Sequence, residues 1–255
     1  MDDIVPPPRP DKVYYFTTCL IDLFYPSAGL AGIELLRREG VKVAMPDTQS
    51  CCGQPPFSGG YFEEARTVAL QQLKAFPGDC PIVVPSGSCG GMMRYQYLDL
   101  FKGRPEYEEV KAFSARVYEL TWFLVHVLKI KLEDKGEPVK VTWHGSCHSM
   151  RKMGVVEEPK QLLRSLSNVT LIEADYEKEC CGFGGSFSVK MPEVSTAIVS
   201  DKIANIAATG AEQVVSGDMG CMMNISTAMQ KAEIPVKGRH IAEFLLERVK
   251  GGSRT

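Results

Sequence analysis

The sequence lacks the features that mark several large classes of protein. It has no apolar run of about 18 residues or more, so no membrane span is expected. Its 29 lysines and arginines are balanced by 31 aspartates and glutamates, and a net charge of −2 provides no basic field for a nucleic acid. The N-terminus has no apolar stretch of the kind found in signal peptides. These absences favour a globular cytoplasmic protein, in which thiols stay reduced.

Two common ligand-binding motifs are also missing. No pair of cysteines has the CxxC spacing of most structural zinc knuckles, and there is no ferredoxin-type cysteine run. The glycine-rich "GFGGS" at 182–186 has neither the GxGxxG spacing nor the Lys-Ser/Thr pair of a phosphate-binding loop, which excludes nucleotide binding there.

What is abundant is cysteine, with nine in a chain of 255 residues. Eight of them form two matching sets: Cys19, Cys51, Cys52 and Cys89, then Cys147, Cys180, Cys181 and Cys221. Each member of the second set follows its counterpart by 128 to 132 residues, and each set contains one Cys-Cys-Gly. The chain is therefore predicted to be an internal duplication. Cys80 lies outside the pattern and is predicted to be a small buried hydrophobic residue.

Strands alternate with helices in both halves, which predicts an α/β fold with two similar parallel-sheet halves. Expected strands cover 12–18, 41–46 and 81–87 in the first half, and the second half repeats this order towards Cys147, Cys180 and Cys221. Expected helices cover 29–39, 61–76, 156–166, 194–208 and 221–231, and a strand followed by a helix ends each half. The predicted division is an extended arm at 1–12, a first half at 13–130, a linker at 131–138 and a second half at 139–250.

This alternation places the cysteines of each set just beyond the carboxyl ends of strands. In open parallel sheets that edge is where ligands bind, so each set is expected to converge there. Four cysteine thiolates hold either a tetrahedral zinc ion or an iron–sulfur cluster. Adjacent thiolates point in different directions, which suits two irons of one cluster better than one small ion. The pattern therefore favours an iron–sulfur cluster, with zinc as the alternative and disulfides as the least favoured reading.

Six segments carry a resemblance to a known family, and they cover nearly the whole chain: "FTTCLIDLFYP", "QSCCGQPPFSGG", "PSGSCGGMM", "HGSCHSMR", "ECCGFGGSFSVKMPE" and "SGDMGCMMN". The chain resembles the lactate utilization protein A family, whose duplicated cysteine-rich CCG domains are related to those of heterodisulfide reductase. The resemblance implies two [4Fe–4S] clusters, one held by each set of four cysteines. It also implies electron transfer in the oxidation of L-lactate to pyruvate, together with a ferredoxin-like iron–sulfur protein and a third small protein.

The chain departs from the full CCG pattern, which ends in CxxC and supplies a fifth cysteine. Met92 and Asn224 stand at that last position, so four cysteines per half remain. This number suits an ordinary four-iron cubane and argues against disulfide-reducing chemistry of the five-cysteine kind. Two alternatives stay open: an iron–sulfur subunit of a flavin-dependent glycolate or 2-hydroxy-acid oxidase, and a zinc-stabilised scaffold without enzymatic activity.

Several further residues are candidates for supporting roles. His144 and His148 flank Cys147 and are candidates for a proton relay or for hydrogen bonds to the cluster, and Arg151 is a candidate for holding a substrate carboxylate. Capping or lining a loop is the equally weighted alternative for the two histidines. His126 is expected to be an ordinary core or helix-surface histidine, and His240 to cap the last helix.

Overall fold

The computed structural model describes residues 4–251 and divides them into two compact units. The first unit runs to Ile130 and also includes His148–Val155. The second unit contains Lys131–Cys147 and continues from Val156. Residues 1–3 of the predicted arm lie outside the described range. The rest of the arm is fastened to the first unit by Arg9, which donates hydrogen bonds to the carbonyl oxygens of Leu128 (3.0 Å) and Glu39 (2.6 Å).

Each unit contains one four-stranded sheet in which all strands are parallel. In the first unit the order is β2-β1-β3-β4, formed by β1 (Lys12–Tyr15), β2 (Lys42–Ala44), β3 (Ile82–Val84) and β4 (Val117–Glu119). In the second unit the order is β6-β5-β7-β8, formed by β5 (Val139–His144), β6 (Val169–Leu171), β7 (Gln213–Ser216) and β8 (Lys237–His240). The identical strand order confirms the predicted α/β fold with two similar parallel-sheet halves.

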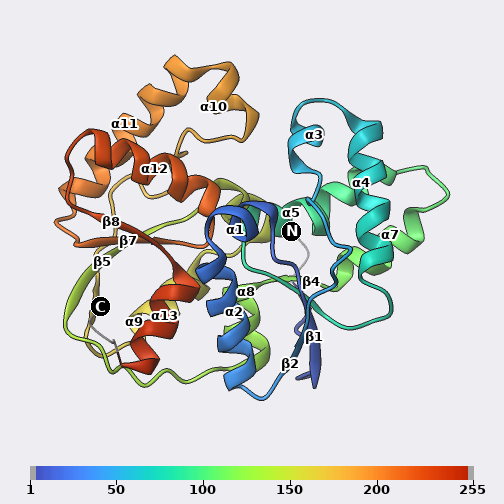
Figure 1. Cartoon of the computed structure of the whole chain (residues 1–255), viewed down its shortest axis with the longest axis horizontal. Helices are drawn as coiled ribbons and strands as arrows, with labels where there is room; N and C mark the ends of the chain where they lie inside the picture. Colours follow the sequence, from blue (N-terminus) through green and yellow to red (C-terminus); the bar gives the residue numbers. More distant parts are fainter. Residues whose placement is uncertain (1–3, 252–255) are drawn as a thin grey trace. The chain divides into compact units, whose positions relative to one another are not determined.

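Helices cover both faces of the sheet in the first unit. They are α1 (Cys19–Phe24), α2 (Pro26–Arg38), α3 (Gln54–Ser58), α4 (Phe62–Ala75), α5 (Gly87–Gly91), α6 (Tyr97–Phe101), α7 (Tyr107–Ala115) and α8 (Leu120–Phe123). Three π-helical turns join them: η1 (Met92–Gln96), η2 (Leu124–Leu128) and η3 (Ser149–Met153). Figure 1 shows α2 and α8 on one face of the sheet and α4 and α7 on the other.

The second unit repeats this sandwich. Its helices are α9 (Glu157–Arg164), α10 (Ser186–Lys190), α11 (Pro192–Ala208), α12 (Met219–Lys231) and α13 (Ile241–Lys250). In Figure 1, α9 and α13 lie on one face of the sheet, and α11 and α12 lie on the other. Because helices cover both faces of each sheet, an inner strand can be apolar on both sides, as the fully buried β3 of the first unit is.

The strands are shorter than predicted, and α2, α11 and α12 begin two or three residues earlier than predicted. β3 ends at Val84, before Pro85, and Cys89 is already the third residue of α5. Cys221 is likewise the third residue of α12. The residues around Cys89 are small because η3 packs closely against α5. A Cβ atom at Gly87 would lie 2.4 Å from the Cβ of Ser149, a separation that real structures do not tolerate.

The last strand of each unit ends in a residue that caps the following helix. The Glu119 carboxylate accepts a hydrogen bond from the backbone N–H of Trp122 (3.0 Å) at the start of α8. His240 accepts one through Nδ1 from the backbone N–H of Ala242 (3.1 Å) at the start of α13. The predicted capping role of His240 is therefore confirmed, and both caps satisfy amide groups that a helix start leaves unpaired.

The segment predicted as a linker contains a buried ion pair. Asp134 accepts two hydrogen bonds from the Arg248 guanidinium (2.7 and 2.8 Å), and the exposed fractions of the two side chains are 1% and 7%. It also accepts backbone N–H bonds from Gly136 (3.1 Å) and Asn168 (2.8 Å). Burial alone would raise the pKa of Asp134, but these four donors outweigh it and lower the pKa below its usual value. The pair therefore stabilises the second unit above about pH 4, and this contribution is lost as the pH falls.

We expect Asp134→Asn to lower the free energy of unfolding by about 3 kcal/mol, because it leaves a buried guanidinium without a counter-charge. Urea unfolding at pH 7 measures this loss. Glu133→Gln is the control, since the neighbouring Glu133–Lys135 pair is exposed, and it should change the free energy by less than about 0.5 kcal/mol. Equal losses in the two variants would contradict this role for Asp134.

Candidate metal centres

The structure brings the four cysteines of the first set together at the carboxyl edge of the first sheet. Cys19 begins α1, Cys51 and Cys52 lie in the loop after β2, and Cys89 lies in α5. The Sγ atoms of Cys19 and Cys51 are 4.0 Å apart. Cys52 makes side-chain contacts with both Cys51 and Cys89. The four thiols thus form one continuous group drawn from three separate loops and helix starts.

The second set has the same arrangement in the second unit. Cys147 follows β5, Cys180 and Cys181 lie in the loop ahead of α10, and Cys221 lies in the first turn of α12. Side-chain contacts join Cys147 to Cys180, and Cys181 to both Cys180 and Cys221. Cys181 and Cys221 are buried, whereas Cys180 is exposed.

In each group one thiol ionises far more readily than the two thiols that donate hydrogen bonds to it. Hydrogen bonds from the Cys19 and Cys52 thiols lower the pKa of Cys51 to about 3. Those from Cys147 and Cys181 lower the pKa of Cys180 to about 2. The pKa values of the donating thiols rise in return. Four thiols this close cannot all carry charge unless a cation is present, so the donor set fits a metal centre.

The glycine after each cysteine pair turns the chain so that its amide faces back. Gly53 and Gly182 have φ of 84° and 79°, in the left-handed region that other residues rarely adopt. Their backbone N–H groups donate to the sulfur atoms of Cys51 (3.5 Å) and Cys180 (3.3 Å). Such amide-to-sulfur hydrogen bonds tune the potential of iron–sulfur centres.

In each cysteine pair, one hydrogen bond fixes the carbonyl group of the second cysteine. Neither of these two bonds was predicted from the sequence. The Tyr97 hydroxyl donates to the carbonyl oxygen of Cys52 (2.9 Å), and the Asn224 amide donates to that of Cys181 (2.8 Å). Asn224 stands where the full CCG pattern has its last cysteine, and its counterpart Met92 is completely buried in the core. The missing fifth cysteines are thus replaced by a hydrogen-bonding residue and a packing residue.

A buried polar side chain on the second long helix of each unit holds the loop before the cysteine pair. In the first unit, Gln72 on α4 donates to the Ser50 hydroxyl (2.7 Å) and accepts from the Ser50 amide (3.3 Å). In the second unit, Lys202 on α11 donates to the carbonyl oxygens of Tyr176 (2.7 Å) and Glu177 (3.3 Å). Both residues lie far from the cysteines in sequence, and a polar residue inside an apolar helix face is the only signal that could have found them.

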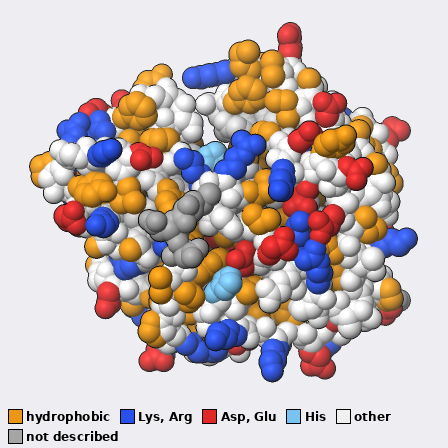
Figure 2. All heavy atoms as spheres, turned by 180° about the vertical axis from the view of Figure 1, so that it is seen from behind, with side chains coloured by type: hydrophobic (Ala, Val, Ile, Leu, Met, Phe, Trp, Pro, Cys, Tyr) orange, Lys and Arg blue, Asp and Glu red, His pale blue; other side chains and the backbone are white. Residues whose placement is uncertain are grey.

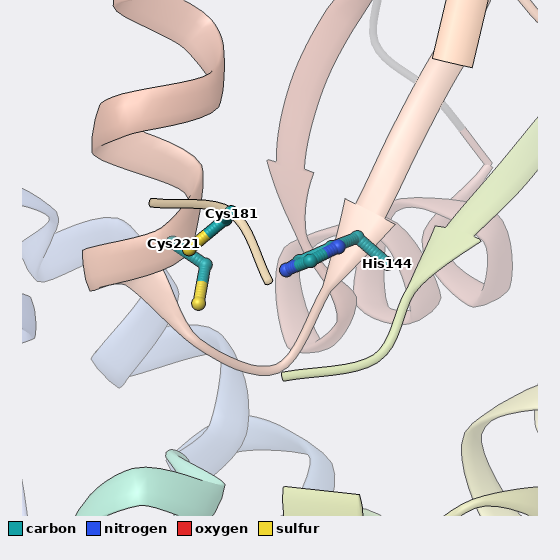
Figure 3. A group of neighbouring side chains, drawn as sticks. All are labelled: His144, Cys181 and Cys221. Carbon is teal, nitrogen blue, oxygen red and sulfur yellow. The ribbon is translucent and has the colours of Figure 1, made fainter. Parts of the chain in front are cut away.

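His144 differs from the other candidates for supporting roles. One of its ring nitrogens and the sulfur atoms of Cys181 and Cys221 all lie within 4.8 Å of one another. The three side chains are buried, and Figure 3 shows the imidazole pointing from the end of β5 towards the two sulfur atoms. Burial and the nearby Lys202 ammonium group lower the pKa of His144 to about 3, so the ring is neutral.

The remaining candidates lie elsewhere. His148 precedes η3 and is half-buried, and Arg151 is an exposed residue of η3; both belong to the first unit. The ring of His126 packs on Trp122 with 4.9 Å between centroids, as expected of an ordinary helix histidine. Cys80 is only half-buried, so its prediction as a buried residue was wrong. It lies in the turn just before β3, where the chain is still partly open to solvent.

A cavity of about 420 Å³ opens beside the first centre. Its lining includes Cys19, Cys51, Asp22 and Gln49. A larger cavity of about 660 Å³ in the same unit, lined by residues such as Phe76 and Arg116, has no cysteine in its wall. The 420 Å³ cavity therefore gives solvent or a small molecule access to one side of the first thiol group.

The family model described as "Cysteine-rich domain" (CCG) matches the chain twice, at residues 13–94 and 141–226, which together make up more than half of its length. Curated relatives include "Lactate utilization protein A" of Geobacillus kaustophilus, which is 43% identical over 93% of this chain and 99% of its own length. The protein of the same name from Oceanobacillus iheyensis is 42% identical over 94% and 99%. The chain belongs to the lactate utilization protein A family.

This membership confirms the family predicted from the cysteine motifs. The solved structure titled "Crystal structure of a hypothetical protein from Helicobacter pylori" has a similar fold, with a TM-score of 0.65. The two proteins are 10% identical, and the match covers 99% of this chain and 51% of the other. This structural match supports the fold of the present member of the lactate utilization protein A family. At 10% identity it carries no information about the chemistry of that member.

Charged side chains of both signs occur on the described surface, as expected from the nearly equal numbers of basic and acidic residues. Figure 2 shows basic and acidic side chains interspersed over the face it presents. Among residues 4–251, no helix is both long enough and apolar enough to span a bilayer.

The two glycines after the cysteine pairs differ in the space around them, and we expect this to separate their alanine variants. Gly53→Ala should cost about 1 kcal/mol, from the left-handed backbone alone. At Gly182 a Cβ atom would also lie 2.6 Å from the backbone oxygen of Ser195, whereas the nearest atom at Gly53 is 3.4 Å away. Gly182→Ala should therefore lose at least about 1 kcal/mol more than Gly53→Ala.

Denaturant unfolding of the two variants under identical conditions measures this difference. Metal analysis of the same samples shows whether Gly182→Ala also loses the metal of the second centre. If Gly53→Ala were the more damaging change, the close packing of Gly182 on α11 would not be the constraint that the structure indicates.

Proposed function

We propose that this chain is the iron–sulfur electron-transfer subunit of a multi-protein system that oxidises L-lactate to pyruvate. The observation that carries the proposal is the pair of four-thiol groups, one at the carboxyl edge of each sheet. Relatives named lactate utilization protein A, aligned over 93% of this chain and 99% of their own length, supply the substrate class.

Cys19, Cys51, Cys52 and Cys89 would hold one [4Fe–4S] cluster, and Cys147, Cys180, Cys181 and Cys221 would hold the other. When bound, such clusters accept and release single electrons. The protein contributes the surroundings of the sulfur atoms. Gly53 and Gly182 donate N–H bonds to sulfur, and Tyr97 and Asn224 fix the backbone of the cysteine pairs.

The proposed partners are those that would provide the electron carriers that this chain lacks. The described residues contain a cysteine group in each unit, and the sequence has no ferredoxin-type cysteine run to carry electrons onwards. A ferredoxin-like iron–sulfur protein and a third small protein of the same system, in the cytoplasm, would complete the path from lactate to the acceptor.

Zinc remains a second candidate because of one distance. The Sγ atoms of Cys19 and Cys51 are 4.0 Å apart, close to the edge of about 3.8 Å in a tetrahedron of four thiolates around zinc. A protein with zinc in both units would be a scaffold and would transfer no electrons. Metal and sulfide analysis separates the two candidates directly.

Protein purified without oxygen should contain about eight irons and eight sulfides, the content of two four-iron clusters. Cys52→Ser and Cys181→Ser remove matched buried ligands from the first and second centres. Each variant should therefore retain about four irons, and chemical analysis with visible absorption measures the loss. Cys80→Ser is the control, because Cys80 belongs to neither group, and it should retain all eight. Zinc without sulfide in the wild-type protein would overturn the proposal.

The reconstituted system should reduce an artificial electron acceptor when L-lactate is added. Omitting this chain, or replacing it with the double variant Cys52→Ser/Cys181→Ser, should lower the rate at least about tenfold, because the electron path is broken. Pyruvate formation measures the reaction. A faster rate with glycolate than with L-lactate would move the protein to a different 2-hydroxy-acid system.

A further inference from the structure

The two halves differ at one position beside the thiol groups. The segment "KVYYFTTC" leads to Cys19 and "KVTWHGSC" leads to Cys147, and they align without a gap. Phe16 in the first half therefore corresponds to His144 in the second. Both side chains are buried, with exposed fractions of 0% and 2%, so the same site in the fold holds an apolar ring once and an imidazole once.

An imidazole at this position is costly unless something binds it. Neither Nδ1 nor Nε2 of His144 has a hydrogen-bond partner among the described residues. A buried polar atom without a partner lowers the stability of the fold, and Phe16 shows that a phenyl ring fills the equivalent place without that loss. The position of the ring thus points to a ligand that the protein residues themselves do not provide.

The surroundings of the ring identify the kind of ligand. One His144 nitrogen lies within 4.8 Å of the buried sulfur atoms of Cys181 and Cys221, and Figure 3 shows the ring directed at them. Donor atoms at this separation can bind the same metal ion or neighbouring ions of one cluster. The Lys202 amine on the same side of the fold is occupied by the carbonyl oxygens of Tyr176 and Glu177.

We propose that His144 coordinates a metal of the second centre in place of one of the four thiolates assigned to it above, so that this centre has mixed histidine and cysteine ligation while the first has cysteine alone. The proposal rests on the proposed function only in requiring that the second cysteine group holds a metal. A neutral imidazole in place of a thiolate removes negative charge and raises the reduction potential of an iron–sulfur centre. The two centres would then differ in potential, and electrons would rest preferentially on the second.

The test is pulsed EPR of the reduced full-length protein, which measures the hyperfine coupling of nitrogen to the cluster spin. Wild type should show one strongly coupled nitrogen on one of its two centres. His144→Phe, which copies the residue of the first half, should lose this coupling, and the potential of one centre should fall while the other stays unchanged. His126→Phe is the matched control, since its ring packs on Trp122, and it should keep the coupling.

A wild-type spectrum with only weak nitrogen couplings, as from backbone amides, would overturn the proposal, as would a strong coupling that persists in His144→Phe. If His144→Phe fails to fold, His144→Gln fills the site with a polar side chain and gives the same readout. If the wild-type protein holds zinc instead of iron, the proposed function fails but the inference is still tested. X-ray absorption at the zinc edge should then show a nitrogen ligand that His144→Phe removes, and sulfur ligation alone would overturn the proposal.

Discussion

The structure depends on a single constraint, the need to hold four thiols close together without letting their charges repel one another. In each unit the thiols gather where a parallel sheet delivers three loops to one edge. One sulfur per group carries the charge and accepts hydrogen bonds from its neighbours, as the lowered pKa values of Cys51 and Cys180 show. A bound metal replaces this shared-proton arrangement with positive charge. The glycine turns, the buried polar residues Gln72 and Lys202, and the carbonyl-binding Tyr97 and Asn224 all serve to keep the cysteine loops in place.

The duplicated chain contains this arrangement of four cysteines twice, and the residues around the two cysteine groups differ. The backbone is repeated, with the same strand order and the same left-handed glycine after each cysteine pair. The surroundings are different. The loop before the pair is held by neutral Gln72 in the first unit and by cationic Lys202 in the second. Phe16 occupies the place in the first unit that corresponds to His144 in the second. The surroundings of the two thiol groups therefore differ in charge and in polarity.

Much of the fold could be predicted because periodic patterns report it directly. The alternation of strands and helices, the cap at His240 and the duplication are visible in the order of residues. The boundaries were less accurate. Helices α5 and α12 begin before Cys89 and Cys221, and small residues allow α5 to pack against η3. The linker at 131–138 is polar in sequence, yet Asp134 is buried there by Arg248, more than 100 positions away. No local pattern contains such a partner.

The sequence by itself determined that eight cysteines, the candidate metal ligands, come in two equal sets. Cysteine spacing and the two Cys-Cys-Gly pairs carry that information, because a repeated motif needs no knowledge of three-dimensional distance. Only the tertiary structure decided which neighbours act on those thiols. It showed that His144 points at Cys181 and Cys221, whereas His148 and Arg151, equally near in sequence, belong to the first unit. The reason is physical: hydrogen bonding, burial and charge act through space over a few ångströms, and residues adjacent in the chain can be carried to different surroundings within one turn.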